Sequence, residues 1–282
     1  MRANNLLEVQ DLWVRFRTPT GMVDAVRGVS FNLAREKLGI VGESGSGKSQ
    51  TGRAILGLNG PSAEVTAEQL DFAGIDLLHA SKRQLRELRG GRITMVMQDP
   101  KFSLNPVLTV GRQIVEAYRA HAPKSSRAEA REKALAMLEA VHIRDPRRVF
   151  NTYPHEVSGG MGQRIMIAMM LITDPDVLIA DEPTSALDVT VQLQVLAILD
   201  DLVSQRGLGL IFISHDLNLV ASFCDRVLVM YGGKIMEACA AKELERAQHP
   251  YTRGLLNCLP RIDSRHAELP VLTRDPAWLG RS

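Results

Sequence analysis

The stretch Gly42-Glu43-Ser44-Gly45-Ser46-Gly47-Lys48-Ser49 decides the fold class of this chain. The apolar run Leu38–Val41 precedes it, and a segment of helical composition, Gln50–Leu58, follows it. A strand, a glycine-rich loop and a helix in this order are the context that makes the pattern G-x4-G-K-[ST] a phosphate-binding loop. The stretch therefore predicts an α/β protein that binds a nucleotide.

The residue types of this loop suit phosphate chemistry. Glycines carry no Cβ, so successive backbone N–H groups can turn towards an anion, and the helix N-terminus adds a partial positive charge. We expect Lys48 to reach the β- and γ-phosphates and the Ser49 hydroxyl to ligate Mg²⁺. The alternative is a chance glycine-rich turn, which the flanking strand and helix disfavour. The predicted nucleotide contacts here are Gly42, Glu43, Ser44, Gly45, Ser46, Gly47, Lys48, Ser49 and Gln50.

Composition sets the class but not the function. The 282 residues are 45% hydrophobic and 23% charged, as in a soluble globular protein with an ample core. A net charge of +2 argues for neither a nucleic-acid binder nor an acidic-surface protein. Three widely spaced cysteines predict no disulfide framework and suit a reducing cytosol. The longest apolar run, Ile165–Ile172, is shorter than the ~20 residues that cross a bilayer, so we expect any membrane role to run through a partner.

Polar side chains follow three apolar strands. Gln98 follows Ile93–Met97, the acids Asp181 and Glu182 follow the run that starts at Val177, and His215 comes soon after Ile213. Ligands of open α/β sheets bind at the carboxyl ends of strands, so these residues are candidates for one site. The alternatives are an ordinary strand-end glutamine, a surface acidic pair and a structural histidine. The repeated placement favours function.

Each candidate has a chemical role. Asp181 can hold the water shell of Mg²⁺ beside Ser49, and Glu182 can orient or deprotonate an attacking water. His215 is a candidate contact to the γ-phosphate or that water. Phe16 lies on an early strand, where an adenine could stack on its ring, although a half-buried strand aromatic is an equally good interpretation.

The remaining pattern predicts the elements around this site. Two strands, within Leu6–Phe16 and Met22–Leu33, read as a hairpin, and Gly232-Gly233 predicts another. Helical spacing covers Leu77–Leu88 and most of Thr109–Ile143, and this second block reads as an inserted subdomain. A further helix is predicted from Met161. Ser158, Gly159 and Gly160 precede it, and a serine N-cap followed by glycines leaves backbone N–H groups exposed at the helix start. The tail from His249 is expected to pack irregularly.

Taken together, these motifs resemble those of the ATP-binding subunit of ABC transporters over nearly the whole chain. The phosphate-binding loop matches that family's Walker A motif, and Gln98 matches its Q-loop. Val157–Met161 matches its signature, and Val177–Asp181 with Glu182 matches Walker B. The D-loop corresponds to Ser185-Ala186-Leu187-Asp188, and His215 to the switch histidine. The resemblance implies Glu182 as the catalytic carboxylate with Gln98 and His215 beside it, Ser49, Gln98 and Asp181 at Mg²⁺, and Ser158–Gly160 and Asp188 at the nucleotide.

Three phrases resemble the subgroup that imports oligopeptides, dipeptides, nickel, opines and similar solutes. They are Gln98-Asp99-Pro100 with Ser103-Leu104-Asn105-Pro106, then Tyr153-Pro154-His155-Glu156, and His249–Arg253. Gly162 departs from the arginine usual in the family, so a contact at the helix start is in doubt. Some members of the subgroup bind an iron–sulfur centre through a cysteine cluster. The sequence up to Ser282 has none, so no such centre is expected.

The resemblance implies a fold and a set of partners. The expected fold is a P-loop NTPase (RecA-like) core with an antiparallel β subdomain and an inserted α-helical subdomain at about 101–160. The ATP-binding domain would cover 1–260, and 249–282 would be a short C-terminal extension. ATP would lie between two subunits paired head to tail, identical or homologous. Two permeases and, indirectly, an extracytoplasmic solute-binding protein complete the assembly, which places the chain peripherally on the cytoplasmic face of the cell membrane, with no nucleic acid.

Two other functions compete with transport. One is an ABC-type ATPase of DNA repair or translation, which usually carries long coiled-coil insertions or two cassettes, and neither feature is in the sequence. The other is a nucleotide-binding regulator without turnover, which predicts a damaged Walker B acid, whereas Glu182 is present. The transported solute does not follow from the sequence, nor does the choice between a homodimer and a heterodimer.

Overall fold

The computed structural model describes residues 5–97, 103–185, 187–258, 272 and 275–279. The chain forms two compact units. The P-loop unit comprises Leu7–Leu78 and Phe212–Ser282, and the helical unit comprises His79–Ile211 together with the first six residues. The phosphate-binding loop and His215 belong to the P-loop unit, whereas Asp181, Glu182 and the signature belong to the helical unit.

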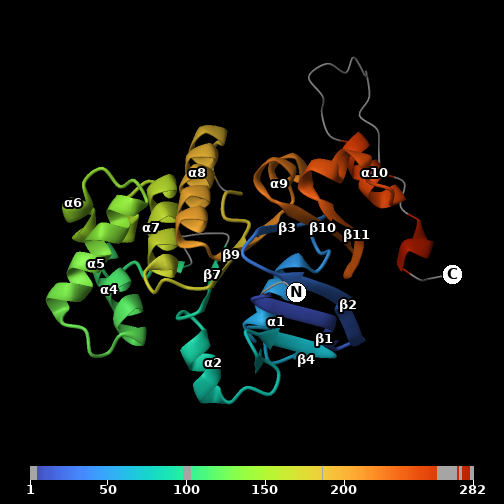
Figure 1. Cartoon of the computed structure of the whole chain (residues 1–282), viewed down its shortest axis with the longest axis horizontal. Helices are drawn as coiled ribbons and strands as arrows, with labels where there is room; N and C mark the ends of the chain where they lie inside the picture. Colours follow the sequence, from blue (N-terminus) through green and yellow to red (C-terminus); the bar gives the residue numbers. More distant parts are fainter. Residues whose placement is uncertain (1–4, 98–102, 186, 259–271, 273–274, 280–282) are drawn as a thin grey trace. The chain divides into compact units, whose positions relative to one another are not determined.

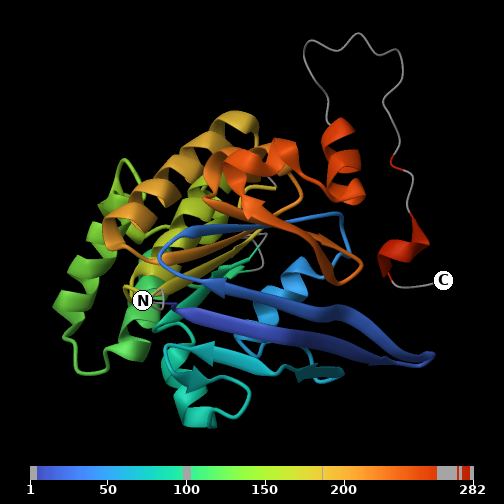
Figure 2. The same ribbon diagram turned by 45° about the vertical axis from the view of Figure 1, so that its right-hand side comes forward.

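A long antiparallel hairpin opens the P-loop unit (Figure 2). Strand β1 (Leu7–Thr18) pairs with β2 (Gly21–Leu33) from Leu7 opposite Leu33 to Thr18 opposite Gly21, which confirms the predicted hairpin. Leu7 and Val9 are buried on β1, and the register of the strand shifts between Val9 and Leu12, after which Leu12 and Val14 are buried. An extra residue in the strand moves the apolar pattern by one position. The remaining strands of this sheet are β4 (Ala63–Thr66), β5 (Gln69–Phe72) and β6 (Ile75–Asp76).

The strand that leads into the phosphate-binding loop lies in a second sheet. Strand β3 (Lys37–Val41) pairs in parallel with β10 (Arg226–Tyr231), with Val41 opposite Val229. Strand β11 (Lys234–Ala240) then pairs antiparallel with β10, as Gly232-Gly233 predicts. Helix α1 (Lys48–Ile55) packs against β1 and β2, and α9 (Leu217–Phe223) packs against β3. The loop is thus held between a buried strand and a packed helix.

The helical unit contains the predicted helical block (Figure 1). Helices α4 (Val110–His121) and α5 (Arg127–Ala140) pack on α7 (Gly159–Leu171), the signature helix, and α6 (Pro146–Phe150) packs on α4 and α5. Strands β7 (Ile93–Val96) and β8 (Val177–Asp181) pair in parallel in the same unit, and α8 (Val189–Arg206) packs on α7. Arg206, the last residue of α8, forms an ion pair with Asp174, which lies between α7 and β8. The other elements are α2 (Lys82–Leu88), η1 (Pro154–Glu156), β9 (Gly209–Ser214), which ends in the P-loop unit, η2 (Ala241–Arg246), α10 (Pro250–Asn257) and η3 (Pro276–Leu279).

The predicted helix Leu77–Leu88 is wrong over its first five residues, because α2 begins only at Lys82. Ser81 forms a capping box: its hydroxyl accepts the Gln84 N–H at 3.3 Å, and the Gln84 side chain accepts the Ser81 N–H at 3.0 Å. This pair satisfies N–H groups at the helix start and fixes the boundary.

The prediction of an irregular tail from His249 is wrong over Pro250–Asn257, which form α10. His249 Nδ1 accepts the N–H of Tyr251 at 3.2 Å, and Pro250 occupies the first helical position, where a missing N–H costs nothing. Tyr251 is fully buried, with its ring centroid 4.5 Å from that of Tyr231. The side chain of Trp278 in η3 lies edge-on to both tyrosine rings.

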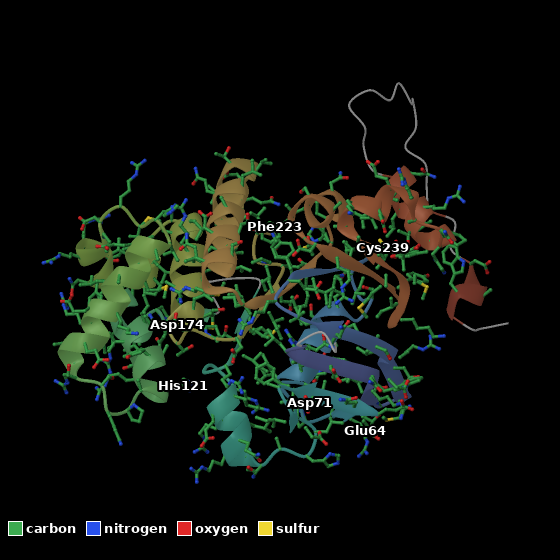
Figure 3. The ribbon with its side chains drawn as sticks, viewed as in Figure 1. Glu64, Asp71, His121, Asp174, Phe223 and Cys239 are labelled. Atoms are coloured by element: carbon green, nitrogen blue, oxygen red, sulfur yellow. The ribbon has the colours of Figure 1, made fainter. Side chains whose placement is uncertain are left out.

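The three cysteines form no disulfide among themselves. Cys224 is buried beside β3, and burial raises the pKa of its thiol to about 12. Burial also raises the pKa of Cys239 on β11 (Figure 3). Both side chains are therefore neutral thiols at pH 7.

Among the helices in the described part of the chain, none combines the length and the apolar composition needed to cross a bilayer.

The capping box of α2 gives a test of the helix boundary. Ser81→Ala removes one acceptor for the N–H groups of the first turn, and we expect local opening of α2 to become easier by about 0.5–2 kcal/mol. Amide hydrogen exchange at Leu85–Leu88 should accelerate accordingly. The control is Ser62→Ala, because Ser62 is also exposed and caps no helix. Equal exchange rates in the two variants would show that the cap does not hold the helix start.

Candidate nucleotide site

The phosphate-binding loop closes around the ammonium group of Lys48. Its Nζ donates to the carbonyl oxygens of Gly42 and Glu43, both at 2.8 Å, and lies 3.4 Å from Ser46 Oγ. Lys48 is only 5% exposed, so the cation is held inside the loop. Ser49 is half-buried on the first turn of α1. The positive charge of the Lys48 ammonium is therefore held at a fixed position inside the loop.

The backbone around the loop leaves no room for a side chain at Gly42 or Gly47. Gly47 has φ 100°, and a Cβ there would lie 2.4 Å from the Ala25 carbonyl oxygen of β2. The Gly233 N–H donates to the Ser46 carbonyl oxygen at 3.0 Å, and Gly233 in turn accepts the Arg27 N–H at 2.8 Å. Strand β2 and the β10–β11 turn thus brace the loop from outside. Sequence analysis reads Gly232-Gly233 as a hairpin turn only and misses this bracing role.

The loop fits a polyphosphate. Gly47, the N-cap of α1, has no side chain, so it cannot cap the first-turn N–H groups of the helix. These donors and the helix dipole favour an anion at the helix start. Gly45 is exposed with φ 79°, and a Cβ there would meet no atom within 4 Å, so the loop crest stays open to a ligand.

Two further candidates lie in the P-loop unit. His215 is exposed directly after β9, a strand that neighbours β3 in the sheet. The residue that follows it, Asp216, caps α9 by accepting the Leu219 N–H at 3.0 Å. Phe16 is half-buried on β1, between Val23 of β2 and Ala63 of β4. This environment is compatible with both interpretations of Phe16, so its contact with adenine stays a prediction.

In the helical unit, the two acids lie at the end of β8, as predicted: Asp181 is its last residue and Glu182 follows it. Val177–Ala180 are fully buried, and Asp181 is 5% exposed at the end of the strand. Glu182 is half-buried and has φ 48°, a left-handed conformation that non-glycine residues rarely adopt. The turn after it holds this conformation, because the Ser185 N–H and hydroxyl both donate to the Glu182 carbonyl oxygen, at 3.3 and 3.2 Å. The backbone therefore turns sharply at the candidate base.

The Q-loop residue cannot be placed in the same way. In the register of β7 with β8, Val96 lies opposite Ala180, so both strands end at one edge of the sheet. Gln98 comes two residues after Val96 but lies outside the described residues. Its place near Asp181 stays a prediction.

The signature lies at the start of α7, and the D-loop ends at the start of α8. Ser158 caps α7 by accepting the Met161 N–H at 3.4 Å, and Asp188 caps α8 by accepting the Val191 N–H at 3.0 Å. A Cβ on Gly160 would lie 2.5 Å from Val191 Cγ1, whereas one on Gly159 would meet nothing within 4 Å. Gly160 therefore permits close packing of α7 on α8, a second contact that sequence reasoning misses.

The donor set fits Mg²⁺. The predicted ligands are a hydroxyl oxygen from Ser49, an amide oxygen from Gln98 and a carboxylate oxygen from Asp181, and oxygen donors are those that this hard cation prefers. Asp181 is buried at a strand end, where a bound cation would offset the cost of a buried negative charge.

The fold and the loop define a P-loop nucleotide-binding protein. Residues 26–185 match the family model described as "ABC transporter". The probable peptide ABC transporter ATP-binding protein y4tR of Sinorhizobium fredii is 51% identical over 96% of this chain and 82% of its own length. The oligopeptide transport ATP-binding protein OppD of Salmonella typhimurium is 48% identical over 99% of this chain and 83% of its own.

Solved structures agree with the sequence matches. The dimeric structure of MJ0796, a bacterial ABC transporter cassette, has a TM-score of 0.75 at 26% identity and covers 84% of this chain and 99% of its own. A post-hydrolysis dimer of the same cassette, bound to ADP and Pi, has a TM-score of 0.72 over the same shares. The chain belongs to the ABC transporter family, as an ATP-binding subunit and ATPase of that family. The predicted family and fold class are confirmed.

The contact between Gly160 and Val191 can be tested by a rescue experiment. Gly160→Ala forces a Cβ against Val191 Cγ1, and we expect it to lower the free energy of unfolding by about 1–3 kcal/mol. Gly159→Ala is the matched control and should change stability by less than about 1 kcal/mol. The double variant Gly160→Ala/Val191→Ala should be less destabilised than the sum of its single variants. Urea unfolding of the nucleotide-free protein measures the stability of these three variants and of Val191→Ala alone. If the effects of Gly160→Ala and Val191→Ala simply added in the double variant, the contact would be contradicted.

Proposed function

We propose that this chain energises the import of peptides or a related small solute, such as nickel or an opine, through partner permeases. The observation that carries the proposal is similarity over almost the full chain to proteins named for peptide transport. Three such relatives are 48–51% identical over 96–99% of this chain. The three phrases of the peptide-importer subgroup support the same substrate class.

We assign the chemistry of hydrolysis to four residues. Lys48 would bind the β- and γ-phosphates and hold their charge in place. Glu182 would take the proton of a water whose oxygen attacks the γ-phosphorus, while the bond to the β–γ bridging oxygen breaks and ADP leaves. His215 and Gln98 would contact the γ-phosphate or the water. Phe16 would stack on the adenine.

Mg²⁺ would be held by Ser49, Gln98 and Asp181. Its contribution is to neutralise charge on the phosphate oxygens while hydrolysis proceeds.

The ATP site would be completed by a second ATP-binding subunit. The backbone N–H groups at the start of α7, at Ser158–Gly160, would bind the γ-phosphate of an ATP that sits on the other subunit's loop. Asp188 would lie at the same interface. Because the sandwich needs the γ-phosphate, ATP binding would close the dimer and hydrolysis would reopen it.

This assignment implies further partners and a location. The helical subdomain would pass the motion to two permeases, and an extracytoplasmic solute-binding protein would deliver the solute. The chain would therefore work at the cytoplasmic face of the cell membrane, as a peripheral subunit that contacts no nucleic acid.

Purification of the tagged chain from gently solubilised membranes tests transport against the rival functions. Recovery of two polytopic permeases in constant proportion to the chain supports transport. Recovery of ribosomes or DNA without any permease would favour the non-transport ATPases.

The role of Glu182 as base leads to a direct prediction. Glu182→Gln keeps the size of the side chain but removes the proton acceptor, so we expect ATP turnover to fall by about 10²–10⁴-fold. Binding of ATP to the Lys48 loop should persist within about threefold, since the loop is unchanged. Steady-state phosphate release and equilibrium binding of a fluorescent ATP analogue measure the two quantities.

Glu68→Gln is the matched control, because Glu68 is an exposed glutamate far along the chain from the loop and from β8. It should hydrolyse ATP at the parental rate. If Glu182→Gln did so too, the base would have to be another group.

A further inference from the structure

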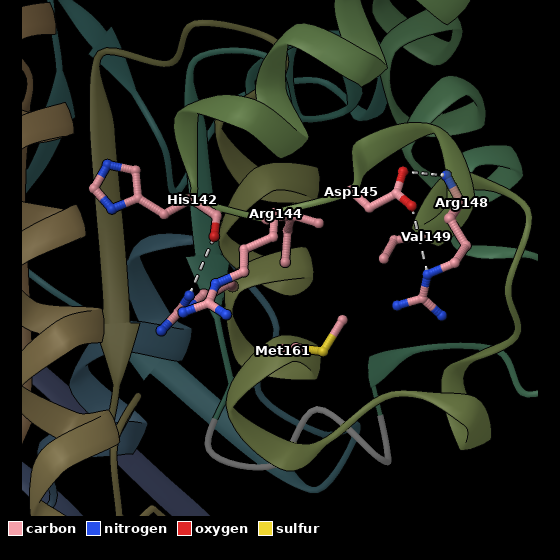
Figure 4. A pocket seen from close by; sticks show the side chains of 8 residues that line it. His142, Arg144, Asp145, Arg148, Val149 and Met161 are labelled. Carbon is pink, nitrogen blue, oxygen red and sulfur yellow. Dashed lines mark hydrogen bonds and ion pairs between the residues drawn. The ribbon is translucent and has the colours of Figure 1, made fainter.

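A cavity of about 250 Å³ in the helical unit lies beside the signature helix but is not used by the nucleotide site described above. Its lining comes from the α5–α6 connection, from α6 and from α7 (Figure 4). The lining residues are His142, Ile143, Arg144, Asp145, Arg148, Val149, Met161 and Arg164. We propose that this cavity binds a small organic monoanion, a carboxylate with an apolar body.

The cavity is shaped by a fixed backbone. Helix α5 ends in a Schellman motif, in which the His142 N–H donates to the Glu139 carbonyl oxygen at 2.8 Å and the Ile143 N–H to that of Leu138 at 3.0 Å. His142 has φ 56°, the left-handed conformation that this motif requires. Asp145 then caps α6 by accepting the Arg148 N–H at 3.1 Å. The connection is thus held at both ends, so the wall is preformed.

The opposite wall is tied to this connection by Arg164 of α7. Its guanidinium donates to the His142 carbonyl oxygen at 3.3 Å and to Gln194 of α8. Figure 4 shows the His142 ring turned away from the cavity, so His142 contributes backbone rather than its imidazole. The two terminal nitrogens of Arg164 therefore link α7 to the α5–α6 connection and to α8, whereas its buried Nε has no hydrogen-bond partner among the described residues.

The inner surface of the cavity is apolar. Ile143 and Val149 are 5% and 1% exposed, and the half-buried Met161 thioether lies across from Val149 (Figure 4). A cavity of about 250 Å³ is just below the ~300–1,000 Å³ of sites for drug-sized ligands, which limits the ligand to a smaller molecule. These side chains suit a short aliphatic or aromatic body.

The charges at the rim select a monoanion. Asp145 and Arg148 pair with each other, with Arg148 Nε 3.7 Å from Asp145 Oδ2. Arg144 is exposed and makes no ion pair in the described part of the chain, whereas the Arg164 guanidinium already donates to two neutral oxygens of the protein, so Arg144 offers a ligand the more accessible cation. Asp145 at the rim would repel a second negative charge, so a single carboxylate is favoured over a dianion. The geometry favours a carboxylate held by Arg144, with its apolar body over Val149 and Met161.

A direct binding experiment uses 3-phenylpropionate as the probe and the full chain labelled with ¹³C at its methionine methyl groups. We expect a saturable shift of the Met161 methyl resonance, which is assigned by its loss in Met161→Leu. The neutral 3-phenylpropionamide should bind about tenfold or more weakly, because it lacks the charge that pairs with Arg144. Failure of the acid to shift Met161 at about 10 mM, or equal affinity of acid and amide, would overturn the proposal.

Matched arginine variants locate the charge. Arg144→Gln should weaken binding of 3-phenylpropionate about tenfold to a hundredfold, the range for a lost charge-assisted hydrogen bond. Arg147→Gln is the control, because Arg147 is also exposed on the same short segment but does not line the cavity. Both positions are exposed, so neither change threatens folding. Equal affinity in the two variants would overturn the assignment of Arg144.

Discussion

The close approach of the backbone to the phosphate-binding loop is the constraint on which the P-loop unit depends. The Ala25 carbonyl leaves no room for a Cβ at Gly47, and the Gly233 N–H holds the carbonyl of Ser46. Strands distant in sequence thus fix a loop whose own residues have little stiffness. The buried ammonium of Lys48 is then held by two loop carbonyls. A loop fixed in this way can present donors to a phosphate without reorganising, which is what electrostatic preorganisation requires.

Local chemistry explains why much of this was predictable. A P-loop has a sequence pattern because its glycines and its lysine are required by the loop itself, and β3 and β8 are continuous apolar runs because they are buried. The acids Asp181 and Glu182 stand out because charges rarely follow such a run directly. The order of the motifs then predicted the family, which the similarity of the chain to ABC transporter proteins confirms.

The features that the sequence did not predict depend either on contacts between distant segments or on the residues that set where a helix begins. Nothing in the local sequence pairs Gly160 with Val191, or the Gly233 turn with Ser46, because each contact joins elements through space. The boundary of α2 was missed because Leu77 and Leu78 continue its apolar pattern, whereas Ser81 and Gln84 decide where the helix starts. Helix α10 was missed because Pro250 reads as a break, although proline at a first helical position is favourable. The cavity beside Met161 has no sequence signal.

The central claim is that the loop around Lys48 is half of a site and that the turn at Ser158 completes it from another subunit. ATP turnover per chain, measured over a hundredfold range of subunit concentration, tests this claim most directly. The series is run on the chain alone and again with any homologous ATP-binding subunit that is recovered with it from the membrane. We predict that ATP turnover per chain rises with the concentration of the subunit whose signature, Ser158–Gly160 in this chain, completes the site. Turnover per chain that is constant across the whole range in both series would contradict it.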